Sequence, residues 1–160
     1  MERVSRPPAE GGRLQMVDVG EKPATRRVAE AEGAIRMSAG AFRTVAERRL
    51  AKGDVLTASE LAGMLAAKRT AELIPLCHPL GLSFMGVEGS IDVDKGEIEL
   101  IAEVRTTGPT GVEMEALTAA SVAALTVYDM IKGIERGAEI ASIVLLYKAG
   151  GRSGEWRRPS

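Results

Sequence analysis

The chain has a single cysteine and a single histidine, Cys77 and His78, among its 160 residues. One cysteine excludes an intramolecular disulfide, and these two residues are too few for the four-ligand sites that hold zinc in proteins. We therefore predict no metal site. No run approaches the ~20 apolar residues that cross a bilayer, and residues 1–13 lack the apolar stretch of a secretory signal. We expect a soluble, cytoplasmic protein.

An excess of charge of one sign is also missing. Lys and Arg total 21 against 22 Asp and Glu, so no overall charge draws the chain to nucleic acid or a membrane. Aromatic residues make up 3% and hydrophobic residues 45%, which indicates a folded domain with an aliphatic core. We predict a disordered tail over residues 1–15, a single catalytic domain over 16–155 and a C-terminal tail over 156–160.

Hydrophobic periodicity and turn residues predict seven elements in the order strand, helix, helix, strand, strand, helix, strand. Leu61 and Leu65 are expected on the buried side of the second helix, which Asp54 or Thr57 caps. The predicted ranges are 25–37, 39–50, about 55–73, 82–93, 97–104, 111–132 and 140–147. This order predicts an α+β fold, a ferredoxin-like split β-α-β sandwich with an antiparallel sheet, helices on one face and an extra helix. The uncovered sheet face indicates an oligomer.

The predicted helix over 111–132 has ionisable residues at both ends and an almost uncharged middle. Glu113 and Glu115 in its first turn suit the helix dipole or a binding site. Asp129 and Lys132 share a helix face, either as a surface ion pair or as an acid–base pair. Glu115 and Asp129 lie ~21 Å apart along an ideal helix. If both ends are functional, two chains must meet at the site or the ends serve different sites.

His78 is held in a short loop between Pro75 and Pro79. Its imidazole either completes the structure of the loop or binds a ligand that the rigid backbone helps to position. Cys77 is more typical of a small buried residue than of a nucleophile, because no second histidine is present to activate it.

Several cations adjoin turns or a helix end, and each is either a solvated surface residue or a ligand for an anion. They are Lys52, Lys68, Arg69, Lys148 and Arg152. The glycine-rich segment 148–154 can wrap an anion with backbone N–H groups, although it lacks the order of residues in a P-loop. Lysines, one histidine and no metal cluster together favour a phosphorylated small molecule as the ligand.

Five long, contiguous motifs carry a resemblance to a known family. They are KGDV at 52–55, AAKRT at 66–70, LIPLCHPL at 73–80, TGVEMEALTAASVAALTVYDMIK at 110–132 and LLYKAGGRSG at 145–154. Together they closely resemble the cyclic pyranopterin monophosphate synthase family, or molybdenum cofactor biosynthesis protein C. The resemblance covers about residues 16–155.

This resemblance implies a lyase of molybdenum cofactor biosynthesis that forms cyclic pyranopterin monophosphate. Its substrate would be 3′,8-cyclo-7,8-dihydroguanosine triphosphate, a GTP-derived triphosphate, and diphosphate would be released. The family uses no iron–sulfur cluster, and we expect no cofactor. Family members are ferredoxin-like hexamers, trimers of dimers with sites between subunits. We expect neither nucleic acid nor membrane as a partner.

The resemblance also implies roles for individual residues. Asp129 and Lys132 match the family's acid–base pair, and His78 and Lys52 complete the catalytic set. The residues implied in substrate binding are Lys68, Leu76, Cys77, His78, Glu113, Met114, Glu115 and Lys148. The lysines would hold the triphosphate and stabilise the charge of the leaving diphosphate. Arg152 stands where a lysine is common in the family.

Two other functions remain open at this point. A non-catalytic nucleotide-sensing module would bind the triphosphate without releasing diphosphate, because ferredoxin-like oligomers often bind small ligands at interfaces. A structural assembly subunit would lose no specific ligand when Lys52, Lys68 or His78 is replaced by alanine.

Overall fold

The computed structural model describes residues 14–159, so the predicted disordered tail falls almost entirely outside the described residues. These residues form five strands and four helices. In order they are β1 (Thr25–Arg36), α1 (Ala39–Ala46), α2 (Val55–Ala67), α3 (Thr70–Leu73), β2 (Leu82–Asp92), β3 (Glu97–Gly108), α4 (Glu113–Ile131), β4 (Glu139–Ala149) and β5 (Trp156–Arg157).

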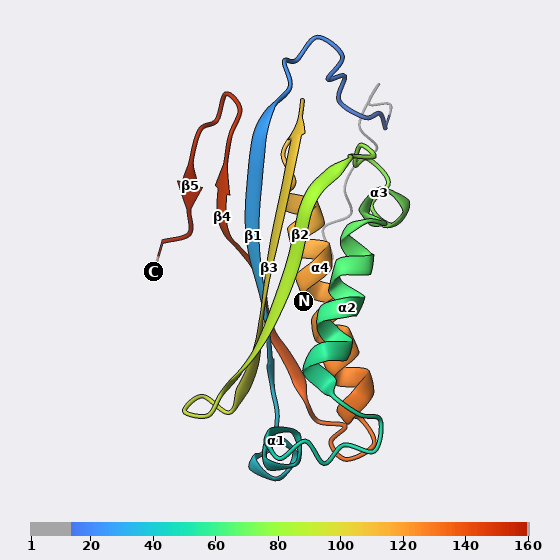
Figure 1. Cartoon of the computed structure of the whole chain (residues 1–160), viewed down its shortest axis with the longest axis vertical. Helices are drawn as coiled ribbons and strands as arrows, with labels where there is room; N and C mark the ends of the chain where they lie inside the picture. The colour runs from blue at the N-terminus through green and yellow to red at the C-terminus, as the bar shows by residue number, and fades with distance from the viewer. Residues whose placement is uncertain (1–13, 160) are drawn as a thin grey trace, which may run out of the picture.

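The strands form one antiparallel sheet in the order β2-β3-β1-β4-β5. β1 and β3 lie at its centre and pair along their whole lengths, from Thr25 opposite Gly108 to Arg36 opposite Glu97. The helices α2 and α4 cover one face, and α1 lies at one end of the molecule (Figure 1). This arrangement confirms the predicted α+β sandwich with helices on one face and an extra helix.

The alternation in β3 explains why this sheet has one buried face. Ile98, Leu100, Ala102 and Val104 are fully buried against the helices, as side chains two apart on a strand share a face. The facing helix α4 contributes small residues, so its backbone lies close to the sheet. The buried alanines of α4 are Ala116, Ala119, Ala120, Ala123 and Ala124. Among the described helices, α4 alone is long and apolar enough to span a membrane, a test that a buried core helix also passes.

Side-chain caps fix the starts of the first two helices. Ser38 Oγ accepts a hydrogen bond from the Ala41 backbone N–H in α1. Asp54, rather than Thr57, caps α2 and accepts from the Thr57 N–H at 3.1 Å. Both caps satisfy backbone donors that have no partner within the helix.

The predicted buried side of α2 is wrong in the single chain. Leu61 and Leu65 are 55% and 49% exposed, whereas Ser59, Gly63 and Ala66 are buried. A Cβ on Gly63 would lie 2.9 Å from the Ala119 carbonyl oxygen, so α2 and α4 are too close for leucines between them. Small residues therefore form the contact, and the leucines face outward.

Several element ends also differ from the sequence prediction. α1 ends at Ala46 rather than residue 50, and α2 ends at Ala67 before the separate turn α3. At that break Thr70 Oγ1 donates to the Ala67 carbonyl oxygen at 3.0 Å. β5 was not predicted. It is only two residues long and pairs with Tyr147 and Lys148 of β4, so it has no periodicity of its own.

Candidate active site

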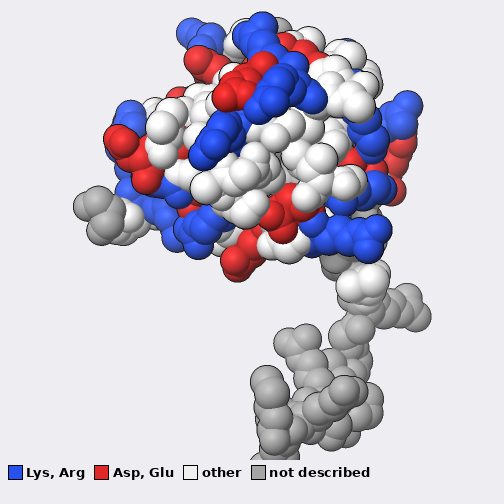
Figure 2. Space-filling model, turned by 90° about the horizontal axis from the view of Figure 1, so that it is seen from below, with Lys and Arg blue, Asp and Glu red and all other residues white. Residues whose placement is uncertain are grey.

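Most of the predicted site residues lie in two separate groups at the two ends of α4. Lys52, Asp129 and Lys132 form one group, called here the C-terminal cluster, at the end of α4, which is the lower end of the molecule in Figure 1. Basic and acidic side chains intermix on that end (Figure 2). Leu76, Cys77, His78, Glu113, Met114 and Glu115 line a hollow at the other end of α4. The two ends are ~21 Å apart by helical rise.

Asp129 holds an ammonium group on each carboxylate oxygen. Its Oδ1 is 2.6 Å from Lys132 Nζ and its Oδ2 is 2.8 Å from Lys52 Nζ. Lys52 Nζ also donates to the Asp129 carbonyl oxygen at 2.7 Å. Lys52 is brought there because the chain turns at Gly53, with φ of 103°, before α2 begins beside the end of α4.

The two lysines determine the charge state of the C-terminal cluster. The hydrogen bonds from Lys132 and Lys52 lower the pKa of Asp129 to about 2, and Asp129 in turn raises the pKa of Lys132. All three side chains are about half exposed, so a substrate can reach them. At neutral pH the C-terminal cluster therefore presents an ionised Asp129 and a protonated Lys132.

The hollow at the start of α4, called here the N-terminal pocket, has a volume of about 330 Å³. The loop from α3 to β2 supplies His78 and Cys77, with a turn closed by the Cys77 N–H donating to the Ile74 carbonyl oxygen at 3.0 Å. The first turn of α4 supplies Met114 and Glu115. The pocket combines an imidazole, the carboxyl groups of Glu113 and Glu115, and apolar walls, which suits a heterocycle with polar edges.

Burial changes the acidity of two groups in this pocket. Glu115 is only 4% exposed, and desolvation raises the pKa of its carboxyl, with a smaller contribution from Glu113. Desolvation also raises the pKa of the Cys77 thiol, and the charge of Glu115 adds to the effect. A thiol with a raised pKa is a poor nucleophile near neutrality. Cys77 is therefore better suited to line this pocket than to act as a nucleophile.

Lys148 lies in a second hollow of about 540 Å³, called here the glycine-loop pocket, between residues 109–111 and 151–153. Its Nζ is 3.7 Å from Glu113 Oε1 and bonds to Ser153 Oγ. This pocket adjoins the N-terminal pocket because four residues line both. They are Lys22, Thr110, Gly111 and Glu113.

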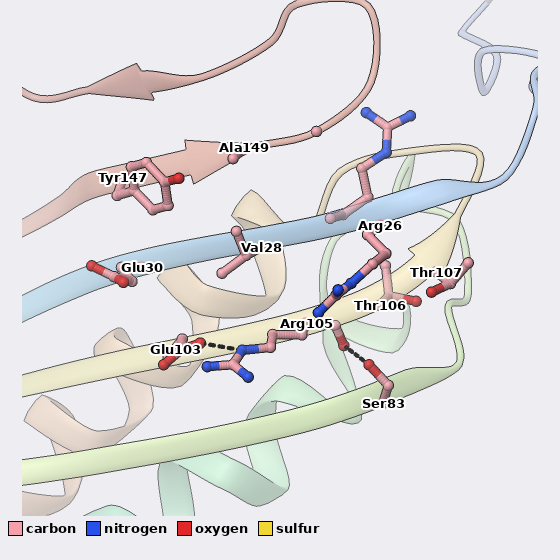
Figure 3. A pocket seen from close by; sticks show the side chains of 12 residues that line it. Arg26, Val28, Glu30, Ser83, Glu103, Arg105, Thr106, Thr107, Tyr147 and Ala149 are labelled. Atoms are coloured by element: carbon pink, nitrogen blue, oxygen red, sulfur yellow. Dashed lines mark hydrogen bonds and ion pairs between the residues drawn. The ribbon is translucent and has the colours of Figure 1, made fainter.

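A further hollow of about 530 Å³ lies on the sheet face opposite α2 and α4 and holds none of the predicted site residues (Figure 3). Arg105 there pairs with Glu103 and lies over the Phe84 ring, and Ser83 Oγ donates to the Arg105 carbonyl oxygen (Figure 3). Arg105 is therefore already partnered within the chain, and Arg26 and Arg27 also line this hollow.

Within residues 14–159, no three His, Cys, Asp or Glu side chains lie close enough together to hold a metal ion. The ionisable side chains at the two ends of α4 can transfer protons and stabilise charge.

Comparison with known proteins identifies the family. The model of the MoaC family matches residues 16–151, nearly the whole described chain. The chain belongs to the MoaC family.

The MoaC relatives it resembles include proteins named cyclic pyranopterin monophosphate synthase from three bacteria. The Cereibacter sphaeroides (strain KD131) protein is 55% identical over 147 residues, which cover 92% of each chain. The Thermomicrobium roseum protein is 55% identical over 149 residues, 93% of this chain and 90% of the relative. The Bordetella petrii protein is 55% identical over 148 residues, 92% of this chain and 91% of the relative.

Not every residue that the MoaC resemblance implies lies in one of these groups. Lys68 caps the C-terminus of α2, and it lines neither pocket within the described residues. Conversely, Lys22 and Arg27 line the glycine-loop pocket and were not predicted as site residues. The adjacent arginines at 26 and 27 were visible in the sequence, but their strand positions are needed to show that Arg27 reaches the helix side.

Proposed function

We propose that this MoaC family member is a cyclic pyranopterin monophosphate synthase, a lyase of molybdenum cofactor biosynthesis. It would convert 3′,8-cyclo-7,8-dihydroguanosine triphosphate into cyclic pyranopterin monophosphate and release diphosphate. The observation that carries this proposal is 55% identity across 92% of the chain to relatives with that name. A pocket for a heterocycle, a cluster of lysines and a carboxylate supply the groups that such a reaction needs.

The N-terminal pocket is proposed to bind the heterocyclic end of the substrate. Leu76, Cys77 and Met114 would pack against the ring system, and His78 and Glu115 would bind its polar edge. Glu115 is buried and desolvation raises the pKa of its carboxyl, so this carboxyl holds a proton more readily than an exposed one does. Glu113 is proposed to hold Lys148 toward the substrate, because the two already lie 3.7 Å apart.

The C-terminal cluster is proposed to carry out proton transfer. Asp129 is ionised at neutral pH because its pKa is lowered to about 2, so it cannot donate a proton there. Lys52 and Lys132 are proposed as the proton donors, and Asp129 orients them through its two carboxylate oxygens. Lys68 and Lys148 are proposed to bind the phosphates and to stabilise charge on the departing diphosphate.

The two ends of α4 support a site shared between subunits. One small substrate cannot span the ~21 Å between Glu115 and Asp129 on one helix. We propose a homo-oligomer, a hexamer built as a trimer of dimers, in which one chain supplies the C-terminal cluster and its neighbour the N-terminal pocket. The half-exposed Leu61, Leu65 and Leu125 on the helical layer offer apolar area for such contacts. We also propose a single catalytic domain over 16–155, a cytoplasmic location and no cofactor.

The test is turnover of the purified full-length chain. Supplied with the cyclic triphosphate substrate, it should release diphosphate and form a product that gives a fluorescent pterin after oxidation. A non-catalytic nucleotide-sensing module would bind the same compound and release no diphosphate. Binding without product would therefore refute the proposed activity.

A further inference from the structure

The end of α4 lacks the left-handed glycine that closes many helices. Such a glycine turns the chain so that backbone N–H groups reach the last carbonyl oxygens of the helix. Gly133 stands two residues after the end of α4 but does not have a positive φ. Instead the N–H groups of Ile134 and Glu135 both bond to the Ile131 carbonyl oxygen, each at 2.9 Å. The turn that begins with Lys132 therefore needs further contacts to hold it.

Tyr128 supplies a side-chain contact to this turn. Its hydroxyl donates a hydrogen bond to the Arg136 carbonyl oxygen at 3.1 Å, across eight residues of chain. Its ring is half-buried and packs against the core cluster that contains Val127 and Ile131. One side chain thus connects the core to the far side of the turn.

Lys132 lies between the two ends of that connection. Residues 128 and 132 are four apart and share a helix face, and the Lys132 N–H donates to the Tyr128 carbonyl oxygen at 2.9 Å. Lys132 Nζ is 2.6 Å from Asp129 Oδ1. Asp129 raises the pKa of Lys132, and the Tyr128 phenol adds a smaller contribution. The phenol is therefore near the ammonium group as well as the backbone of Lys132.

We propose that Tyr128 is a positioning residue of the C-terminal cluster, and that it holds Lys132 in place through its bond to the Arg136 carbonyl oxygen. This inference rests on the proposed function, in which Lys132 donates a proton. When the turn is held, the backbone of Lys132 is fixed on both sides, so its side chain loses less freedom on pairing with Asp129. A tyrosine that only stabilised the fold would leave the Lys132 ammonium unchanged.

The experiment measures how fast a trace of acetic anhydride acetylates Lys132 in the full-length chain, with digestion and mass spectrometry as the readout. Only the neutral amine reacts, so the ion pair with Asp129 protects it. Tyr128→Phe keeps the ring and removes the hydroxyl. It should raise the labelling rate of Lys132 about twofold or more, because an exposed ion pair weakens. Lys95, in ion pairs of the β2–β3 hairpin, is the internal reference and should be unchanged.

The other tyrosine of the chain provides the matched control. Tyr147 lies on β4 with its ring beneath the Arg157 guanidinium, and Tyr147→Phe should leave Lys132 labelling unchanged. Thermal unfolding verifies that each variant is folded. Glu135→Ala is a second variant if Tyr128→Phe unfolds, because Glu135 accepts a hydrogen bond from the Gly137 N–H at 2.9 Å in the same turn. It should raise Lys132 labelling in the same direction.

Turnover of the cyclic triphosphate gives the functional readout. Tyr128→Phe should lower kcat about tenfold, because the proposed proton donor is less well positioned. It should change KM less than about twofold, because Tyr128 lines neither the N-terminal pocket nor the glycine-loop pocket. Loss of stability alone would not separate kcat from KM in this way.

The outcomes distinguish this inference from the proposed activity. Wild-type labelling of Lys132 in folded Tyr128→Phe, or faster labelling with wild-type kcat, would overturn the positioning role. Glu135→Ala decides in the same way if Tyr128→Phe is unfolded. Faster labelling of Lys132 supports the contact even if the wild-type chain releases no diphosphate, and in that case the proposed activity alone fails.

Discussion

Asp129 is the residue on which the geometry of the C-terminal cluster depends. Its two carboxylate oxygens fix two ammonium groups that come from elements far apart in the chain, Lys52 before α2 and Lys132 at the end of α4. Without the carboxylate these two like charges would repel each other and separate. Asp129 thus acts through the lysines it positions as well as through its own charge.

Replacing Asp129 by asparagine should lower product formation by roughly 10²-fold or more, because the proposed proton donors lose their common partner. The measurement is the rate of product formation by the purified chain.

The same substitution should also change how the free energy of unfolding depends on pH. The pKa of Asp129 lies at about 2, below its usual 3.8, so ionised Asp129 stabilises the fold above pH 3.8 and this contribution is lost as the pH falls toward 2. Urea unfolding should therefore show a deficit for Asp129→Asn at pH 7 that shrinks below pH 4. A deficit of equal size at both pH values would contradict the assigned ion pairs.

Glu115 makes the opposite prediction, since burial raises the pKa of its carboxyl above the usual 4.5. A raised carboxyl pKa means that ionised Glu115 destabilises the fold at pH 7, and that this cost disappears as the pH falls below 4.5. Glu115→Gln should then unfold at higher urea than the wild type at pH 7 and at nearly the same concentration at pH 4, while losing activity. Glu139→Gln replaces an exposed carboxylate and is the matched control. A variant less stable than the wild type at pH 7 would refute the desolvation argument.

At the scale of single residues, the sequence predicts contacts between near neighbours on one helix but not contacts between residues far apart in the chain. Asp129 and Lys132 are three apart on a helix, so their contact follows from helical geometry. The contact of Lys52 with Asp129 joins residues 77 positions apart and depends on how α2 packs along α4. The position of Arg27 in the glycine-loop pocket depends likewise on the pairing of β1 with β4.

At the scale of elements, glycines set how closely α4 approaches its neighbours. A Cβ on Gly63 of α2 would lie 2.9 Å from the Ala119 carbonyl oxygen, and one on Gly33 of β1 would lie 2.8 Å from that of Ala120. Each is tighter than side-chain carbons tolerate, so α4 is held between a helix and a strand by two contacts with backbone. This close packing fixes where both ends of α4 lie, and therefore where the two groups of site residues lie.

Gly63→Ala should lower the free energy of unfolding by about 1–3 kcal/mol, because the added methyl forces α2 and α4 apart. Gly40→Ala in α1 is the control. Its Cβ would meet nothing within 4 Å, and the substitution should stabilise the protein by about 0.4–1 kcal/mol through the unfolded chain. Chemical denaturation measures both. Equal effects of the two substitutions would show that the contact at Gly63 is not tight.

Elements with strict periodicity were predictable, and elements shaped by their neighbours were not. The buried face of β3 follows from alternation alone, and the positions of β1, β2 and β4 were predicted to within a few residues. The orientation of α2 was not predictable, because leucine normally marks the buried side of a helix. Here the glycine and alanines of α2 meet the alanines of α4, and Leu61 and Leu65 remain outside.

At the scale of the whole molecule, the long helix separates the groups that the proposed reaction must bring together. The C-terminal cluster and the N-terminal pocket each contain part of the proposed catalytic set. Within one chain the rigid helix α4 keeps the C-terminal cluster and the N-terminal pocket apart. The proposed two-fold arrangement of two chains would bring the end of one α4 to the start of the other, and it would do so twice.

Mixing two inactive variants tests this arrangement. Asp129→Asn damages the C-terminal cluster only, and His78→Ala damages the N-terminal pocket only, so each variant alone should make little product. In a mixed pair of subunits one shared site carries both substitutions and the other carries neither. Random mixing, after partial unfolding and refolding together, should therefore restore roughly a quarter of wild-type activity if the site lies across a two-fold interface. Refolding each variant alone is the control. Mixed samples no more active than the separate variants, although mass spectrometry shows that subunits have exchanged, would place each complete site within one chain.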